Sequence, residues 1–507
     1  MALAKDESHS HNNGEQEQGR RSHFLVVAYG IQGHINPART LAHRLARIGG
    51  CTATLSVSAS GHRRMFPSHG TSCGEEVSDG LISYIPFSDG KDDGSWAMDS
   101  EDRARRREAN FRSLSAVVDR LAASGRPVTC MLWTLSMPVV GEVAREHGLP
   151  VAVYWIQPAT VLATYYHYFH GHGELIAQHG SSSSSSTQDQ VKITLPGLHP
   201  LRISDMPTFL TEEKMTQSDL SKMLFQALRE LFEQIEKEKL TVLVNTFDAL
   251  EDAALKAIRP YMDAFAVGPG VPLPLAALQH KDDAGEAAAQ VHLFKQDEKN
   301  CMEWLDAQLE RSVVYVSFGS LLAYTKRQAE EILHGLQGHG QPYLWVVRRE
   351  GRAEEVDLCV REAEQADSKG MVVEWCDQQK VLSHPSVGCF VTHCGWNSTL
   401  EAVVSGVPML AVPSWSDQPM NAYLVEEEWG MGVRAERDAE GVLTRDELAS
   451  RLELLMGGGE RSVEIRANAQ SLKERAQEAV AKDGPLERSL QNFVSKSMQN
   501  HLDQSRK

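Results

Sequence analysis

The sequence predicts an α/β protein with two Rossmann-like domains, whose parallel sheets face a central cleft. The chain has 507 residues, more than one ordinary hydrophobic core accommodates. In both halves short apolar runs alternate with helical patterns, the order typical of parallel sheets covered by helices on both faces. A stretch rich in Pro, Gly and Ala separates the halves, and we expect it to be a linker.

The first half opens with HFLVVAY, residues 23–29, an apolar run with the length of a buried strand. A Gly-His-Ile-Asn-Pro turn follows and leads into PARTLAHRLARIG, whose apolar residues recur at helical spacing. VVGEVAREHG has the same spacing and predicts another helix. The further strands expected in this half are TATLSVS (52–58), VTCMLW (128–133), VAVYW (151–155) and TVLVNTF (241–247).

The second half repeats the pattern with SVVYVSFGS (312–320), QPYLWVV (341–347), GMVVEW (370–375), GCFVTHC (388–394) and PMLAVP (408–413). The expected domains are a disordered tail at 1–21, an N-terminal domain at 22–263 with a flexible serine-rich insertion near 180–190, a linker at 264–300, a C-terminal domain at 301–480 and a helical tail at 481–507. We expect that last tail to pack back on the N-terminal domain.

Composition excludes several classes of protein. The net charge of −17 disfavours a nucleic-acid binder, which meets phosphates over a broad surface. The eight cysteines form no C-x-x-C pair, which favours reduced thiols. The first 21 residues lack the apolar core of a signal peptide, and no run of about 18 apolar residues occurs. We therefore expect a cytoplasmic monomer with no transmembrane segment and no nucleic-acid partner.

The most informative stretch is VTHCGWNSTLEAVVSGVPMLAVPSWSDQ, residues 391–418. Ligands of open parallel sheets bind beyond the carboxyl ends of the strands, where this stretch begins. Its strand is followed by a turn with Gly395 and by a helix that starts near Asn397 and Ser398. Free backbone N–H groups at such a helix N-terminus, with amide and hydroxyl donors, suit a phosphate, and His393 could add a donor to a diphosphate.

Neighbouring residues suit the rest of a nucleotide sugar. Glu401 lies one turn into the helix and could accept hydrogen bonds from the two hydroxyls of a ribose. Trp375 follows a strand and offers a flat face for a base. Asp417 and Gln418 could accept from and donate to sugar hydroxyls. Base, ribose, diphosphate and sugar together indicate a nucleotide sugar.

Residues 375–418, WCDQQKVLSHPSVGCFVTHCGWNSTLEAVVSGVPMLAVPSWSDQ, resemble the 44-residue signature box of plant family 1 UDP-glycosyltransferases. The resemblance extends over nearly the whole chain, from GIQGHINPA at 30–38 onward. It implies a GT-B fold and an inverting transfer from a UDP-sugar, for which we expect UDP-glucose. We expect no metal or other cofactor, since the helix dipole and hydrogen-bond donors can stabilise the leaving diphosphate. The acceptor would be a hydroxyl or carboxyl of a small molecule of plant secondary metabolism, bound by the N-terminal domain.

The resemblance also implies roles for single residues. Trp375 would stack on uracil, and Cys376 would meet the edge of the base through its backbone. Glu401 would hold the ribose, and Gln378 would be a further residue of the donor site. The diphosphate would be held by His393, Asn397 and Ser398. The sugar would be held by Trp396, Asp417 and Gln418, and Ser320 would lie near the phosphates or the sugar. A glutamine at 418 resembles the glucose-using members, whereas a histidine there is associated with galactose.

His34 matches the general base of the family, and an imidazole suits this role because its ordinary pKa is about 6.5. Most members orient that histidine with an aspartate. The equivalent stretch here is MLWTLSMP, which has Thr134 at the matching position. A threonine hydroxyl can orient an imidazole, but it cannot offset the charge of an imidazolium.

This departure favours carboxylate acceptors slightly, because a carboxylic acid with a pKa near 4 is already ionised and needs no base. The run TLSMPVVGEVAREHGLPVAVYWIQPATVLATYYHYF is similar to a branch that includes anthocyanin 5-O-glucosyltransferases, which also carry threonine there and act on phenols. The same branch includes enzymes that esterify crocetin, abscisic acid or auxin-like acids. Flavonoid or anthocyanin glucosides and glucose esters therefore both stay open.

Other interpretations have weaker support. Gly70–Gly74 fits G-x-S-x-G, but no apolar strand precedes it, so a hydrolase is disfavoured. No G-x-G-x-x-G follows a strand, which argues against a dehydrogenase. Cys376, Cys389, His393 and Cys394 lack the spacing of a zinc site.

Tyr165, Tyr166, Tyr168 and Phe169 suit an acceptor pocket or a buried helix face equally well. A binding protein that has lost turnover through Thr134 is the main alternative function.

Overall fold

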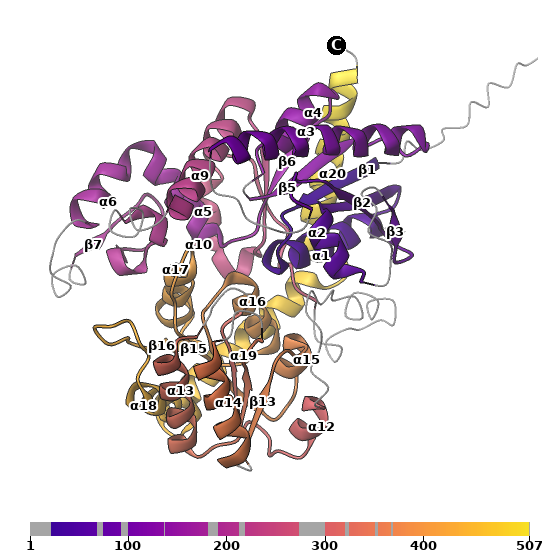
Figure 1. Cartoon of the computed structure of the whole chain (residues 1–507). Coiled ribbons are helices and arrows are strands. Elements are labelled where there is room, and N and C mark those ends of the chain that lie inside the picture. Colours follow the sequence, from indigo (N-terminus) through magenta and orange to yellow (C-terminus); the bar gives the residue numbers. More distant parts are fainter. Residues whose placement is uncertain are drawn as a thin grey trace, which may run out of the picture.

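The computed structural model describes residues 22–67, 75–92, 100–135, 137–180, 191–211, 219–272, 300–319, 324–349, 353–366 and 369–505. The expected N-terminal tail, the serine run, most of the expected linker, the Gly70–Gly74 motif and Ser320 lie outside these residues. The described residues form two lobes, each built on its own sheet (Figure 1). We call them the N-lobe and the C-lobe.

The sheet of the N-lobe has eight strands in the order β10-β9-β6-β5-β1-β2-β4-β3. All neighbouring strands run parallel except β3 and β4. The bounds are β1 Ser22–Ala28, β2 Cys51–Ser58, β3 Val77–Ser78, β4 Ser83–Phe87, β5 Cys130–Thr134, β6 Val151–Trp155, β9 Thr241–Val244 and β10 Ala264–Ala266. A separate pair consists of β7 Lys192–Ile193 and β8 Leu201–Arg202.

The sheet of the C-lobe has six parallel strands in the order β13-β12-β11-β14-β15-β16. Their bounds are β11 Val313–Ser317, β12 Tyr343–Val346, β13 Gly370–Val373, β14 Val387–Thr392, β15 Met409–Ala411 and β16 Gly432–Arg434. The α/β fold class with two parallel sheets is thereby confirmed.

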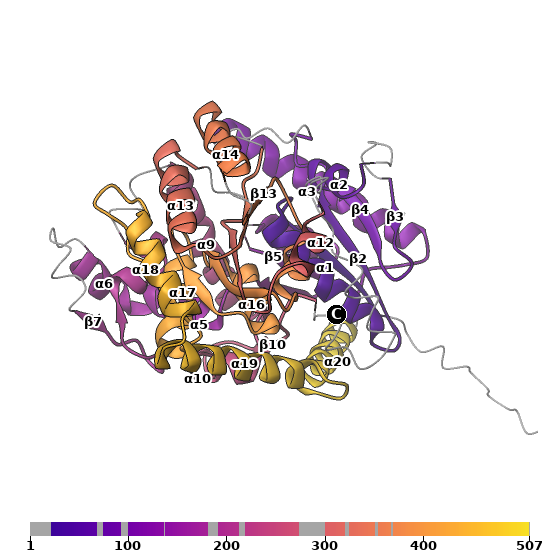
Figure 2. The same ribbon diagram turned by 90° about the horizontal axis from the view of Figure 1, so that it is seen from below.

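Helices flank both sheets (Figures 1 and 2). The first half contains α1 Gln32–Arg47, α2 Ala59–Met65, α3 Ser100–Ala123, α4 Val139–Glu146, α5 Ala159–His167, η1 Tyr168–His172, α6 Gly173–Gly180, η2 Ile203–Asp205, η3 Thr208–Leu210, α9 Asp219–Glu238 and α10 Asp248–Ile258. The second half contains α12 Cys301–Asp306, α13 Lys326–His339, α14 Glu354–Ala366, α15 Gln378–Leu382, α16 Trp396–Ser405, α17 Gln418–Tyr423, η6 Leu424–Glu428, α18 Arg445–Met456, α19 Glu460–Val480 and α20 Pro485–Ser505.

The central strands are buried on both faces, as expected of parallel sheets covered by helices. Phe24, Leu25, Val26 and Val27 of β1 all have no exposed surface, although their side chains alternate between the two faces. Continuous apolar runs therefore identify these strands in the sequence.

Six of the described strands lie outside the expected set: the two-residue strands β3, β7 and β8, and the strands β4, β16 and β10. β4 pairs with β2 although it contains Pro86, a residue that removes a backbone donor and is uncommon inside sheets. β16 has only three residues, too few for a recognisable pattern. β10 pairs with β9 and so extends the N-lobe sheet into residues that we expected to be linker.

The end of the chain returns to the N-lobe. Helix α19 contacts α16 of the C-lobe and α10 of the N-lobe, and α20 then packs against β10. Phe493 of α20 is buried, and its ring centroid lies 5.9 Å from that of Phe24 and 6.3 Å from that of Phe265. Figure 2 shows α19 and α20 leading from one lobe to the other.

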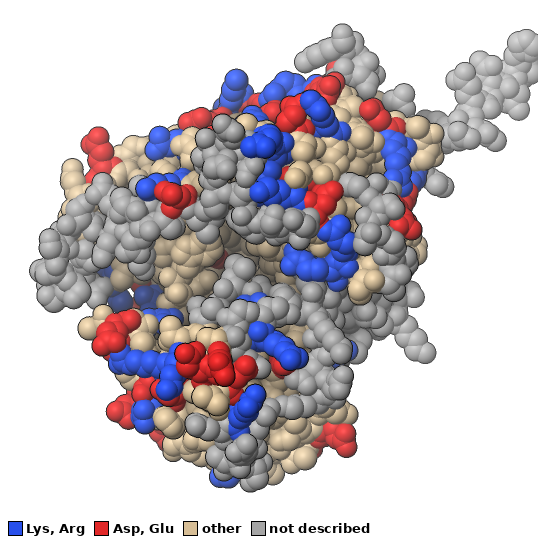
Figure 3. Space-filling view, in the orientation of Figure 1, with Lys and Arg blue, Asp and Glu red and all other residues tan. Residues whose placement is uncertain are grey.

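The visible face in Figure 3 carries interspersed positive and negative side chains, and its surface is hollowed where the lobes meet. Among the helices that the structure describes, none is long and apolar enough to cross a membrane.

The packing of α20 generates a stability prediction. Phe493→Ala should lower the free energy of unfolding by roughly 3–5 kcal/mol, because it leaves a cavity between α20 and the N-lobe sheet. Urea denaturation followed by fluorescence measures this change. Met498→Ala, at a position 38% exposed on the same helix, is the control and should change the value by less than about 0.5 kcal/mol. Equal stability of the two variants would contradict the docking of α20.

Candidate active site

His34 lies in the first turn of α1, directly beyond the carboxyl end of β1. The helix begins at Gln32, five residues before the helical run recognised from Pro37 in the sequence. The Gly-His-Ile-Asn-Pro segment is therefore helical and not a separate turn. His34 thus lies beyond the end of a parallel strand, which is where ligands of parallel sheets bind.

Thr134 is the partner of His34. It ends β5, the neighbour of β1, and its side chain has no exposed surface. The Nδ1 atom of His34 lies 2.8 Å from Thr134 Oγ1, which also accepts a hydrogen bond of 3.4 Å from the backbone N–H of Tyr29. With Nδ1–H donating to the threonine, the basic lone pair of the imidazole lies on Nε2.

Burial lowers the pKa of His34 to about 4, because the protein interior disfavours the imidazolium. The ring is therefore neutral, and able to accept a proton, near pH 7. Of the residues that the structure describes, none supplies an opposing negative charge that raises this pKa. Thr134 thus orients the ring without strengthening it as a base.

The expected diphosphate region of the C-lobe begins where β14 ends. Cys394 has a φ of +57°, a left-handed conformation that turns the chain from the strand into α16. The ring of His393 lies between two glycines. A Cβ atom at Gly319 would lie 2.6 Å from its Cε1 atom, and one at Gly395 would lie 2.5 Å from its Nε2 atom. These glycines make room for the ring at the N-terminus of the helix.

Burial also lowers the pKa of His393 to about 4. A neutral imidazole has one N–H group to donate, so His393 can offer a phosphate a hydrogen bond but no positive charge. The backbone N–H groups at the N-terminus of α16 are then the main feature that attracts an anion.

Gln378 joins several of the expected donor-site residues. Its Nε2 atom donates to Ser398 Oγ at 2.9 Å and to Glu401 Oε2 at 2.5 Å. Its Oε1 atom accepts a bond of 3.2 Å from the hydroxyl of Tyr315, which lies 3.5 Å from Cys376 Sγ. The structure therefore brings Cys376, Gln378, Ser398 and Glu401 together. Trp375, two residues past β13, is partly exposed.

The sequence interpretation missed Tyr315. Its hydroxyl was the available signal, because it places a polar group between the valines of β11. Gly319 was also missed, although glycine after a strand commonly marks close approach of another group.

Asp417 and Gln418 lie at the start of α17. Asp417 is buried and accepts a bond of 2.7 Å from Asn421 Nδ2; burial raises the pKa of its carboxyl, and this hydrogen bond opposes the rise. Gln418 Oε1 accepts from the backbone N–H groups of Ser414 at 2.9 Å and Trp415 at 3.0 Å. This leaves its Nε2 group as the one that can donate to a sugar hydroxyl.

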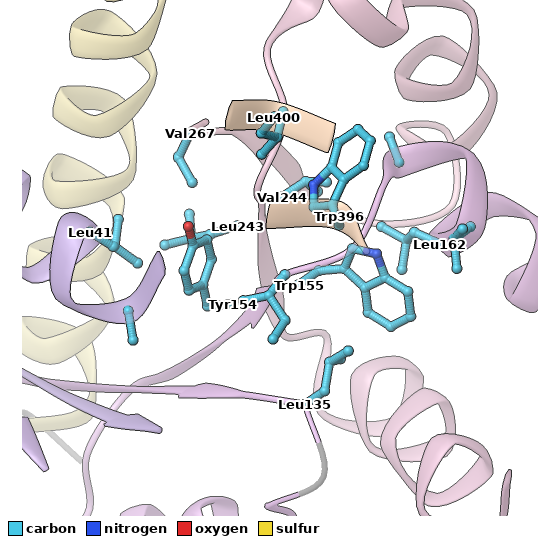
Figure 4. Packing of buried hydrophobic residues seen from close by; sticks show 14 of the residues in the cluster. Leu41, Leu135, Tyr154, Trp155, Leu162, Leu243, Val244, Val267, Trp396 and Leu400 are labelled. Carbon is cyan, nitrogen blue, oxygen red and sulfur yellow. The ribbon is translucent and has the colours of Figure 1, made fainter. Parts of the chain in front are cut away.

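The side chain of Trp396, a residue predicted to hold the sugar, lies at the junction of the lobes. It is 4% exposed, and its indole N–H donates to the backbone oxygen of Asn245 in the N-lobe at 2.8 Å. Figure 4 shows the indole packed beside Trp155 and Val244 in the core between the lobes. Because the large apolar ring is buried there, it holds the lobes together, and only its backbone remains at the start of α16.

Asn397 links the two halves of the site directly. Its Nδ2 atom donates to the backbone oxygen of Gly33 at 3.0 Å. In a regular helix the oxygen of Gly33 would accept from the N–H of residue 37, but Pro37 has no N–H group. The proline therefore leaves this oxygen available to the C-lobe, one residue before His34.

Two other expectations concern side-chain clusters. Cys389 lies inside β14 with no exposed surface, and within the described ranges no three His, Cys, Asp or Glu side chains are placed to bind a metal ion. Tyr165 and Tyr166 are buried on α5, whereas Tyr168 and Phe169 line a cavity of about 510 Å³ together with Phe232 and Arg229.

The arrangement defines a class of protein. The N-lobe has the neutral imidazole of His34 beyond a strand end, and the C-lobe has the N-terminus of α16 with the carboxylate of Glu401. This layout on two parallel sheets is that of a GT-B glycosyltransferase that uses a nucleotide sugar.

Comparisons with known proteins lead to the family. Residues 157–462 match the family model described as "UDP-glucoronosyl and UDP-glucosyl transferase". The chain is 40% identical to crocetin glucosyltransferase, chloroplastic, from Gardenia jasminoides, over 94% of this chain and 97% of the relative. It is 39% identical to anthocyanidin 3-O-glucoside 5-O-glucosyltransferase 1 from Perilla frutescens, over 94% and 98%.

A solved structure shows the same fold. The crystal structure of Os79 from O. sativa in complex with UDP superposes with a TM-score of 0.76 at 29% identity, covering 93% of this chain and all of that one. This chain therefore belongs to the UDP-glycosyltransferase family and is a glycosyltransferase. The resemblance to the plant branch with anthocyanin and crocetin glucosyltransferases is confirmed.

The first prediction from the site concerns Thr134. Thr134→Asp should place a negative charge beside His34 and raise its pKa by roughly one to three units, since an opposite charge favours the imidazolium. The acid limb of the kcat/KM profile for an alcohol or phenol acceptor should move up from about pH 4 accordingly. Thr134→Ser, which keeps the hydroxyl, is the control and should leave the limb in place. An unmoved limb in the aspartate variant would contradict the pairing.

The second prediction concerns Asn397. Asn397→Ala should lower kcat/KM, because Gly33 loses its hydrogen bond and the turn that carries His34 loses its restraint. Adding Pro37→Ala should recover part of the loss, since alanine restores an N–H group that can bond to the Gly33 oxygen. Steady-state kinetics on both variants and on Pro37→Ala alone provide the comparison. If the double variant has the same kcat/KM as Asn397→Ala alone, Asn397 acts only on the donor.

Proposed function

We propose that this protein transfers glucose from UDP-glucose, with inversion, to a hydroxyl or carboxyl group of a small plant metabolite. The observation that carries the proposal is the hydrogen bond between Asn397 and Gly33, because it joins the expected diphosphate region to the turn that bears the expected base. The N-lobe would bind the acceptor and the C-lobe the donor. The relatives whose names state glucosyl transfer support glucose as the sugar.

The residues would act in one displacement. Nε2 of His34 takes the proton of the acceptor hydroxyl while the acceptor oxygen attacks the anomeric carbon. The bond between that carbon and the phosphate oxygen breaks, and UDP leaves with the electron pair. Attack from the face opposite the leaving group inverts the anomeric centre. The N-terminus of α16, with His393 and Ser398, would stabilise the charge on the diphosphate.

The rest of the donor site would select the nucleotide sugar. Trp375 would stack on uracil, and Glu401, held by Gln378, would accept from the ribose hydroxyls. Asp417 and the Nε2 group of Gln418 would contact the glucose. Ser320 would approach the phosphates or the sugar.

The base favours acidic acceptors. General-base catalysis is worth roughly 10²–10⁴-fold, but a base with a pKa of about 4 is weak, and Thr134 cannot stabilise its charged form. A carboxylate is ionised before it reaches His34, and an acidic phenol needs little help. The named activities of the relatives include both chemistries, since crocetin is a carboxylic acid and an anthocyanidin glucoside is a phenol.

We further propose that the enzyme acts as a cytoplasmic monomer without a metal ion. Donors at the N-terminus of α16 can stabilise the leaving diphosphate without a cation, which supports the last point. The relative from Gardenia jasminoides is named chloroplastic, so fractionation of plant cells that express the protein is the appropriate check of its location.

The experiment measures UDP release from UDP-glucose with a panel of flavonoids, anthocyanidin glucosides and carboxylic acids, and tests the products for lability in alkali. His34→Ala should abolish most phenol glucosylation while leaving UDP affinity within about twofold, and should spare the formation of alkali-labile esters. His147→Ala, which changes a histidine at the C-terminus of α4 whose Nε2 atom lies 3.2 Å from Ser115 Oγ, is the control. Full phenol turnover in His34→Ala would refute the base, and no UDP release with any acceptor would favour a binding protein instead.

A further inference from the structure

The turn that carries Asp417 and Gln418 contains an unusual residue. It connects β15 to α17, and within it Ser416 has a φ of +61°. Residues other than glycine rarely adopt this left-handed conformation, because the Cβ atom approaches the backbone. Contacts from elsewhere must therefore hold Ser416, and its conformation sets the direction in which the next two residues leave the turn.

Three hydrogen bonds from the N-lobe reach Ser416. The backbone N–H of Ser416 donates to Thr208 Oγ1 at 2.9 Å, and the backbone N–H of Thr208 donates to the oxygen of Ser416 at 2.9 Å. The side-chain Oγ of Ser416 accepts a bond of 3.3 Å from Gln157 Nε2. Thr208 is 3% and Ser416 is 8% exposed, so water does not readily replace these partners.

The segment that presents Thr208, residues 203–210, is itself anchored to the C-lobe. Asp205 is 1% exposed, and its Oδ1 atom lies 2.9 Å from Nη1 of Arg434 on β16. The ring of Phe209 meets that of Trp415 edge to face, with centroids 5.3 Å apart. Thr208 is therefore held from both sides and can act as a fixed support for the turn.

We propose that Thr208 is a positioning residue for the donor sugar, so that the N-lobe takes part in donor selection through Ser416. The proposal rests on the proposed function, in which Asp417 and Gln418 contact the glucose. Loss of the Thr208 hydroxyl leaves the buried N–H of Ser416 without an acceptor and lets the turn relax. Asp417 and Gln418 then lose their orientation, while the uracil contacts of Trp375 and Cys376 and the ribose and diphosphate contacts on α15 and α16 are unaffected.

The test compares Thr208→Val, which has the same shape without the hydroxyl, with Thr208→Ser, which keeps it. Thr164→Val is the matched control, because its buried hydroxyl bonds at 2.8 Å to Thr160 within the same helix. Thr208→Val should raise the KM for UDP-glucose about tenfold and reduce the preference for UDP-glucose over UDP-galactose. Its affinity for UDP should stay within about twofold of the wild-type value. Thr208→Ser and Thr164→Val should behave as the wild type does, and thermal unfolding checks that all three variants fold.

Several results would overturn the proposal. Unchanged donor kinetics in Thr208→Val would do so. An equal loss of UDP affinity and of UDP-glucose use would also do so, because equal losses would indicate a general structural effect. Gln418→Ala separates this failure from that of the proposed function. If Gln418→Ala alters sugar use and Thr208→Val does not, only the role of Thr208 is refuted. If the wild type uses neither sugar nucleotide, the proposed function fails as well.

Discussion

Contact between the lobes at the carboxyl ends of their sheets is the constraint on which the site depends. The hydrogen bond from Asn397 to the oxygen of Gly33 is the clearest case, because Pro37 leaves that oxygen without its helical partner. One such bond contributes only about 0.5–1.5 kcal/mol, whereas burial of an indole the size of Trp396 contributes several times more. The apolar core between the lobes therefore supplies the stability, and the hydrogen bonds set the geometry.

The chemistry follows from the same burial. His34 and His393 have pKa values lowered to about 4, so both rings are neutral near pH 7. A bound diphosphate would bring negative charge to this region and would favour protonation of nearby imidazoles. The donor could thus supply part of the charge that an aspartate beside His34 supplies in most of the family. A threonine at position 134 is then sufficient, because the main role of this residue is to orient the ring of His34.

Much of this organisation could be predicted from the sequence. Continuous apolar runs identify the central strands, and the 375–418 box predicts the donor residues, because both depend on local spacing. The helix that includes His34 was placed too late, since Gly33 and Pro37 are poor helix formers taken alone. The orientation of Trp396 could not be predicted, because the helical pattern does not tell which neighbour covers a buried face. Thr208 had no local signal at all, since its role arises from a contact 208 residues away in the chain.

The lobes of this protein form one joined site before any ligand binds. Amide hydrogen exchange of Ser416 in the ligand-free protein is the sharpest test, because the N–H of this residue bonds to the opposite lobe. We expect this amide to be protected without ligand, and UDP-glucose to add little protection. Rapid exchange in the free protein that becomes slow only when UDP-glucose is added would contradict the claim, because the donor would then be assembling the site.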